Sequence, residues 1–176
     1  MLIAMAGLPG AGKSYVAARI AEATAAVVVS VDPIEAAMWH AGVGGPDRPD
    51  VPTGYAAYVV AETVAEQALR GGAGVVVDAV NAVEPARAQW RGLAARTGVP
   101  LIFVEVVCSD AATHRSRLEA RRRDIPGFPE PTWDDVASRQ VDAWTHERVV
   151  VDTAGDPRRV DDDVARLVCD LRTRRA

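Results

Sequence analysis

The stretch that decides the fold is residues 7–14, which read Gly7-Leu8-Pro9-Gly10-Ala11-Gly12-Lys13-Ser14. It matches the pattern G-x-x-x-x-G-K-[ST], whose glycines let the backbone turn tightly and approach a phosphate closely. An apolar run over residues 1–6 precedes it, and an alanine-rich stretch over 14–24 with helical character follows it. A strand that turns into a helix N-terminus directs backbone N–H groups at an anion. This context favours a nucleotide phosphate loop over a glycine-rich turn that matches by chance.

The charged and hydroxyl groups that end the loop have distinct expected roles. Lys13 is the sole lysine among 20 basic residues, and its ammonium is expected to reach the β- and γ-phosphates. The Ser14 hydroxyl is expected to bind Mg²⁺. The predicted nucleotide-binding residues are Gly7, Leu8, Pro9, Gly10, Ala11, Gly12, Lys13, Ser14, Tyr15, Arg115, Arg117 and Thr153.

Strand and helix patterns alternate along the whole chain. The predicted strands cover residues 1–6, 27–31, 75–78, 100–107 and 148–151. The predicted helices cover residues 14–24, 34–40, 55–70, 84–96, 110–123, 132–144 and 157–172. Strands separated by helices imply a parallel sheet with right-handed crossovers. We therefore predict one α/β domain over residues 1–176, a three-layer α/β/α phosphate-loop fold with a five-stranded parallel sheet.

Composition excludes several classes of protein. With 49% hydrophobic and 25% charged residues, the chain has a globular composition. Its net charge of −4 gives no overall attraction to nucleic acid or anionic membrane, so nucleic acid is not the expected partner. Cys108 and Cys169 lack the spacing of a disulfide framework or zinc site. No apolar run is long enough to span a membrane, and no signal peptide is expected, so we predict a cytoplasmic monomer or homodimer.

The motif is shared by GTPases, work-coupled ATPases and small kinases. A GTPase normally reads guanine with N-K-x-D, which requires a second lysine that this chain lacks. Work-coupled ATPases usually place Glu directly after the Asp of the third strand, whereas Asp78 is followed by Ala79. These two departures favour a kinase, which must exclude water and present an acceptor hydroxyl.

Two carboxylates follow predicted strands at the edge where the phosphate loop lies. Asp32 follows the second strand, where it can accept the proton of an acceptor hydroxyl. The alternative is that Asp32 only caps a helix beginning at Pro33. Asp78 ends the third strand and is placed to hold Mg²⁺ with Ser14, or it is a solvated strand end.

Basic residues cluster late in the chain, where guanidinium groups can stabilise a phosphoryl group in transfer. Arg117 and Arg121 are four residues apart and share a helix face. The alternative is an ordinary solvated basic face. The loop over residues 152–157, which includes Thr153, either lines an adenine pocket or forms a capped turn. The arginines of the cluster are Arg115, Arg117, Arg121, Arg122 and Arg123.

With these residues the chain resembles small P-loop kinases of the AAA-family ATPase-like group. Relatives in that group include zeta-toxin-like kinases, chloramphenicol phosphotransferase, gluconate and adenylate kinases, and the kinase module of polynucleotide kinases. The resemblance is carried by the phosphate loop, by Ser30-Val31-Asp32, by Cys108-Ser109-Asp110 with the arginines after it, and by Arg139-Gln140.

The resemblance implies ATP as phosphoryl donor, Mg²⁺ as cofactor, and catalytic roles for Lys13, Asp32, Arg117 and Arg121. It also implies a short lid over residues 117–131. One departure concerns the position three residues after Asp32, where many relatives have Arg and this chain has Glu35. That difference disfavours a phosphorylated or nucleic-acid acceptor.

The acceptor is expected to be a small molecule bound between Asp32 and the helix that begins near Tyr55. Two aromatics and several acids there would suit a polyhydroxylated or amine-bearing compound, although the same residues also make an ordinary loop over 41–54. The alternatives to a small-molecule kinase are a polynucleotide 5′-hydroxyl kinase and a regulatory nucleotide-binding module. The candidate acceptor contacts are Trp39, His40, Asp47, Arg48, Asp50 and Tyr55.

Overall fold

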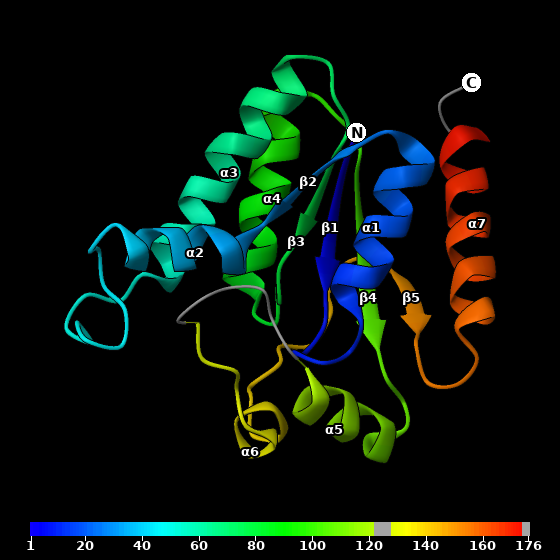
Figure 1. Cartoon of the computed structure of the whole chain (residues 1–176). Helices are drawn as coiled ribbons and strands as arrows, with labels where there is room; N and C mark the ends of the chain where they lie inside the picture. The colour runs from blue at the N-terminus through cyan, green and yellow to red at the C-terminus, as the bar shows by residue number, and fades with distance from the viewer. Residues whose placement is uncertain (122–127, 174–176) are drawn as a thin grey trace.

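A computed structural model describes residues 1–121 and 128–173 of the chain, with side chains as far as Leu171 (Figure 1). Five parallel strands form one sheet in the order β2-β3-β1-β4-β5. The strands are β1 (Leu2–Ala6), β2 (Val27–Ser30), β3 (Val75–Asp78), β4 (Leu101–Val107) and β5 (Val149–Asp152). The predicted five-stranded parallel sheet is therefore confirmed.

Burial explains the order of the strands. All five residues of β1 are buried, and β1 lies in the middle, paired with β3 at Leu2–Val75 and with β4 at Leu2–Leu101. A strand covered on both faces needs a continuous apolar run, and β1 has one. The edge strand β2 leaves Val27 and Val28 partly exposed. The phosphate loop therefore emerges from the most deeply buried strand.

Helices cover both faces of the sheet, as Figure 1 shows. Helices α1 and α7 pack together on one face, with Val16, Ile20 and Val164 in the core cluster there. Helices α3 and α4 cover the other face, where Trp90 and Leu93 are fully buried. The helices are α1 (Lys13–Thr24), α2 (Val31–His40), α3 (Gly54–Arg70), α4 (Glu84–Thr97), α5 (Ala111–Ala120), α6 (Trp133–Ala137) and α7 (Pro157–Thr173). None of the helices within the described ranges combines the length and apolar composition needed to cross a membrane.

The predicted helix over residues 132–144 is wrong in its length. Thr132 caps it as expected, in a capping box with Asp135, but α6 ends at Ala137. The chain beyond is held by tertiary contacts instead, because the buried guanidinium of Arg87 binds the carbonyls of Asp142 and Ala143. Those carbonyls are thereby satisfied outside a helix.

Two other helix boundaries bear on the site. Helix α2 begins at Val31, three residues before the predicted start, so Asp32 lies in its first turn. Ser30, not Asp32, is the N-cap residue, so the alternative in which Asp32 only caps this helix is wrong. Helix α5 ends at Ala120, and Arg122 and Arg123 lie outside the described residues.

Candidate active site

The phosphate loop adopts a backbone that requires glycine. Gly7, Gly10 and Gly12 have φ angles of 136°, 82° and 93°, in the left-handed region that other residues rarely adopt. A Cβ atom on Gly7 would lie 2.2 Å from the carbonyl oxygen of Val106 on β4. The loop thus lies so close to the sheet edge that a side chain at Gly7 does not fit.

The loop ends at the N-terminus of α1, which begins at Lys13 with Gly12 as N-cap. The N-cap Gly12 has no side chain to cap the first turn, and the positive dipole of a helix N-terminus favours an anion. The Lys13 ammonium donates to the Leu8 carbonyl at 3.1 Å, so the side chain folds over the loop. Ser14 is exposed beside it. This arrangement can bind phosphate oxygens from several directions.

Two side chains from distant elements hold the loop in place. His114 of α5 is buried, and its Nε2 lies 2.8 Å from the Pro9 carbonyl oxygen. Thr153, which follows β5, donates from its hydroxyl to the Ala11 carbonyl at 2.8 Å. Because both anchors are buried hydrogen bonds, the loop conformation is supported before any ligand binds.

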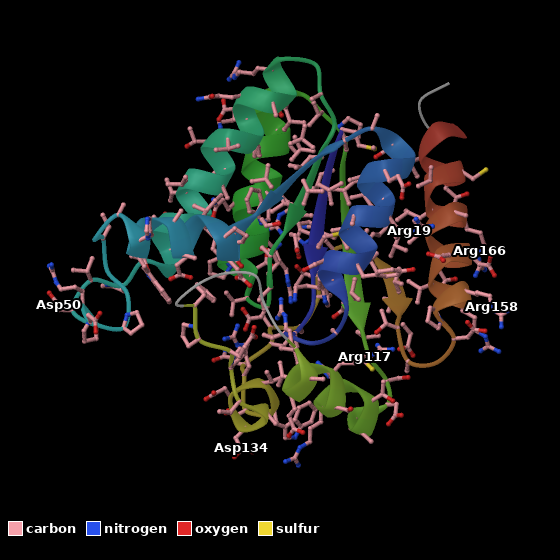
Figure 2. The ribbon with its side chains drawn as sticks, viewed as in Figure 1. Arg19, Asp50, Arg117, Asp134, Arg158 and Arg166 are labelled. Carbon is pink, nitrogen blue, oxygen red and sulfur yellow. The ribbon has the colours of Figure 1, made fainter. Side chains whose placement is uncertain are left out.

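A cavity of about 260 Å³ opens beside the helix end of the loop. Arg117 of α5 lies in its wall and donates to Thr153 Oγ1 at 2.9 Å, and Figure 2 shows Arg117 below the start of α1. Tyr15 lines the opposite wall, and its hydroxyl donates to Asp161 at 2.9 Å, which raises the pKa of that phenol. Gly12, Tyr15, Arg117, Thr153, Pro157 and Val160 line the cavity. Predicted nucleotide contacts from three parts of the sequence therefore come together here.

The other predicted arginines lie apart from this cavity. Arg115 is exposed and pairs with Glu119 one turn along α5, at 2.7 Å. Arg121 directly follows α5 and lies 3.9 Å from Glu130. Of the three, Arg117 is the one that lines this cavity, and the nucleotide contacts of all three stay predictions.

A larger cavity, of about 650 Å³, opens on the other side of the phosphate loop. Pro9 of that loop lies in its wall, together with Asp32 and Glu35 of α2. Polar and aromatic residues from α3 and from the chain after residue 127 complete it. They are Tyr58, Phe128, Glu130, Asp135, Ser138 and Arg139.

Asp32 and its neighbours in this cavity influence one another electrostatically. Burial raises the pKa of the Tyr58 phenol, and the negative charge of Asp32 raises it further, while Arg139 lowers it. The Tyr58 hydroxyl accepts from the Asn81 N–H at 3.3 Å. Asp32, Tyr58 and Arg139 are therefore close enough to act on one bound molecule.

The predicted acceptor contacts do not all come together. Asp50 is near the far end of the loop over residues 41–54, away from the sheet (Figure 2), whereas Tyr55, which is 80% exposed, lines a cavity of about 440 Å³ beside the Asp32 cavity. Trp39 does reach the site region, where it stacks on Phe128 with ring centroids 4.7 Å apart. The sequence analysis missed Tyr58, although Tyr58 lies one helical turn beyond Tyr55. That spacing was the available signal.

A third cavity, of about 440 Å³, adjoins the cavity that Asp32 lines. Gly54, Tyr58, Val80 and Arg139 line both cavities. The remainder of its wall is mostly apolar, with Val83, Pro85 and Ala86. A bound molecule can therefore extend away from Asp32 along α4.

The residues predicted to hold Mg²⁺ fit that ion chemically. Ser14 and Asp78 offer a hydroxyl and a carboxylate, and Mg²⁺ in phosphate sites usually takes only one or two protein oxygens. Asp78 ends β3 at the same sheet edge as the phosphate loop, in register with Ser30 of β2. Within residues 1–121 and 128–173, no group of three or more His, Cys, Asp or Glu is placed to hold a metal ion.

Comparison with known proteins places the chain in a family. A protein-family model described as an AAA domain matches residues 2–145. The chain belongs to this AAA-domain family. A search of curated protein sequences gave no match.

Solved structures show the same fold at low sequence identity. The chain aligns with a protein from Chloroflexus aurantiacus whose kinase assignment is itself provisional, at a TM-score of 0.77 and 20% identity, over 98% of this chain and 96% of that one. It aligns with a gluconokinase from Sinorhizobium meliloti at a TM-score of 0.60 and 21% identity, over 98% of this chain and 95% of that one. It also aligns with the Mycobacterium tuberculosis APS kinase CysC, in complex with AMPPNP and APS. The TM-score is 0.67 and the identity 19%, over 97% of this chain and 96% of that one. The predicted small P-loop kinase fold is thus confirmed for this member of the AAA-domain family.

Proposed function

We propose that this protein transfers the γ-phosphoryl group of ATP to a hydroxyl of a small-molecule acceptor. The observation that carries the proposal is that the phosphate loop lies between two cavities. The cavity with Arg117 and Thr153 opens at the end of the loop near Gly12, and the cavity with Asp32 opens at Pro9. A donor and an acceptor can therefore meet at one loop, as phosphoryl transfer requires.

Each residue of the site has a distinct role in the proposed transfer. The loop N–H groups and the Lys13 ammonium hold the β- and γ-phosphates, and Arg117 stabilises the charge that develops on them. Asp32 accepts the proton of the acceptor hydroxyl as its oxygen forms a bond to the γ-phosphorus. The bond from that phosphorus to the bridging oxygen breaks, and ADP leaves with the electron pair. The products are ADP and a phosphate monoester, with the proton on Asp32.

Ser14 and Asp78 would hold the Mg²⁺ that accompanies the nucleotide. When bound, this ion neutralises charge on the phosphate oxygens. Phe128, Pro129 and Pro131 line the acceptor cavity, and their apolar surfaces would limit the water around a bound acceptor.

A metabolite screen with ATP and Mg²⁺, read by the mass shift of one phosphoryl group, tests the proposal. The Asp32→Asn variant is expected to lose transfer while it still binds ATP in calorimetry. The matched control is Asp50→Asn, an identical change on the loop far from the site, which is expected to keep full activity. Unchanged turnover in the Asp32→Asn variant would remove Asp32 as the base.

Two further assays test the alternative functions. Labelled phosphate on a 5′-hydroxyl oligonucleotide would indicate a polynucleotide kinase, which the net charge of −4 and the acidic acceptor cavity disfavour. Nucleotide-dependent capture of a partner protein, with no phosphorylated product, would indicate a regulatory module.

A further inference from the structure

We propose that the acceptor carries a protonated amine beside its reacting hydroxyl, and that Glu35 binds this ammonium group. The inference rests on the proposed phosphoryl transfer, since it names the class of acceptor that enters the Asp32 cavity. Glu35 lies in that cavity wall, one helical turn after Asp32 on α2. The inference therefore assigns Glu35 as the residue that selects the acceptor by charge.

The carboxylate of Glu35 is fixed by its neighbours. The Thr53 hydroxyl donates to Glu35 Oε1 at 2.7 Å, and the same hydroxyl accepts from the Trp39 indole N–H at 2.6 Å. Thr53, at the centre of this relay, is only 4% exposed. A carboxylate held in one orientation loses less conformational entropy when it binds a cation than a mobile surface side chain does.

The spacing of Asp32 and Glu35 sets the spacing of the groups they would bind. Residues three apart on a helix have Cβ atoms about 5–6 Å from each other and lie on the same face. One small molecule can therefore place a hydroxyl at Asp32 and an ammonium at Glu35. An amino sugar or a short amino alcohol has this separation.

The charges around the cavity favour a cation over an anion. Its described lining contains four acids, Asp32, Glu35, Glu130 and Asp135, against one basic residue, Arg139. Two of the acids have basic neighbours, because Glu130 lies 3.9 Å from Arg121 and the charge of Arg139 acts on Asp135. The Asp135 carboxylate also accepts from the Thr132 N–H and hydroxyl. Asp32 and Glu35 add two carboxylates from α2, so the described lining is acidic overall and would repel an anionic acceptor.

The cavity also provides a surface for the body of such a molecule. Phe128 lies in the wall and is stacked on Trp39, whose indole belongs to the relay that holds Glu35. Aromatic faces pack well against sugar rings and attract cations. The position of Glu35 is thereby coupled to the wall that the acceptor would contact.

Three compounds of one size distinguish the charge classes: glucosamine, glucose and gluconate, which carry a positive, a neutral and a negative group. Binding is measured by ligand-observed NMR on the protein saturated with AMPPNP, at a pH that keeps the amine protonated. Transfer is measured separately with ATP. Glucosamine is expected to bind about tenfold more tightly than glucose, the value of one charge-assisted hydrogen bond, and gluconate less tightly than either. Equal binding of the three, tighter binding of gluconate, or no binding of glucosamine would overturn the inference.

Variants assign the preference to Glu35. Glu35→Gln keeps an oxygen for the Thr53 hydroxyl but loses the charge, so the preference for glucosamine over glucose is expected to disappear. Asp162→Asn removes the same charge from the exposed surface of α7 and is expected to keep the preference. A preference that persists in Glu35→Gln, in a variant whose unfolding temperature and nucleotide affinity match the parent, contradicts the assignment.

The position of Thr53 gives a second, independent variant. Thr53→Val is expected to weaken the preference severalfold by releasing the Glu35 carboxylate, and Thr53→Ser is expected to restore it because the hydroxyl returns. Failure of phosphoryl transfer to every compound, while ATP still binds, would contradict the proposed function alone. The ranking of the three compounds in binding would still decide the inference about Glu35.

Discussion

The guanidinium of Arg117 donates a 2.9 Å hydrogen bond to Thr153 Oγ1, and that hydroxyl donates in turn to the carbonyl of Ala11, 2.8 Å away. One buried hydroxyl therefore connects α5, the chain after β5 and the phosphate loop. Helix α5 thus reaches the loop at two places, at Ala11 through this hydroxyl and at Pro9 through His114. This relationship makes Thr153 a positioning residue for the nucleotide site.

Thr153→Val tests this role, because valine has nearly the same shape without the hydroxyl. The variant leaves the Ala11 carbonyl without its 2.8 Å partner, so we expect a loss of about 1–3 kcal/mol in the free energy of unfolding. We also expect weaker ATP binding in calorimetry, since Arg117 loses its anchor. Thr153→Ser keeps the hydroxyl and serves as the control. ATP affinity equal to that of the parent in Thr153→Val would show that the hydroxyl does not position the loop.

Gly7→Ala tests whether the loop needs a glycine for space as well as for backbone conformation. The added Cβ would lie 2.2 Å from the Val106 carbonyl oxygen, so the loop must move away from β4, and ATP binding is expected to be lost. Gly98 also has a positive φ, of 69°, but an added Cβ there meets nothing within 4 Å. Gly98→Ala is therefore the matched control, with a cost of about 1 kcal/mol in stability and normal ATP binding. If both variants bound ATP equally, close packing of the loop against the sheet would not matter for binding.

Local patterns predicted the fold and the phosphate loop because those features depend on neighbours in sequence. The apolar run of β1 predicts a buried strand, and the glycines after it predict a tight turn. The relay from Trp39 through Thr53 to Glu35 could not be predicted in this way, because Thr53 lies 18 residues from Glu35 and is brought back by the loop between α2 and α3.

The end of α6 could not be predicted for a related reason. Residues 138–144 have a helix-compatible composition, but the carbonyls of Asp142 and Ala143 bind Arg87, which comes from another part of the chain. Long-range contacts override local propensity at such positions. The hydrogen bonds of Thr53 and Arg87 are of this kind, whereas the phosphate loop follows from a local motif.

The third prediction concerns how the contribution of Asp152 to stability changes with pH. Hydrogen bonds from Ser109 and from the Ala154 N–H lower the pKa of this carboxyl in the folded protein. A lowered folded-state pKa means that the stabilisation is complete above the unfolded value of about 3.9 and is lost as pH falls through the folded value. Asp152→Asn is therefore expected to lower the unfolding temperature slightly at neutral pH, and the gap to the parent should narrow below about pH 4. Thermal unfolding across this range measures the gap, and a constant gap would contradict the prediction.

The fourth prediction concerns the buried side chain of Arg87 on α4. This side chain is 1% exposed, and its guanidinium donates to the carbonyls of Asn81, Ala82, Asp142 and Ala143 while lying 3.8 Å from the centre of the Trp144 ring. Arg87→Met fills similar volume but removes the donors of those carbonyls, of which Ala82 keeps a bond from the Asp142 N–H, so we expect a loss of about 3–5 kcal/mol in the free energy of unfolding.

The control for Arg87 comes from the same helix. Arg96 of α4 pairs with Glu62 and Glu66 of α3, and half of the Arg96 side chain is exposed. Arg96→Met is expected to cost about 1 kcal/mol or less, because exposed ion pairs contribute little. Denaturant unfolding of both variants gives the comparison. Since Asn81 also donates to the Met5 carbonyl on β1, two residues before the phosphate loop begins, the Arg87→Met variant should weaken ATP binding as well. Equal stability of the two variants would mean that residues 138–144 hold their conformation without Arg87.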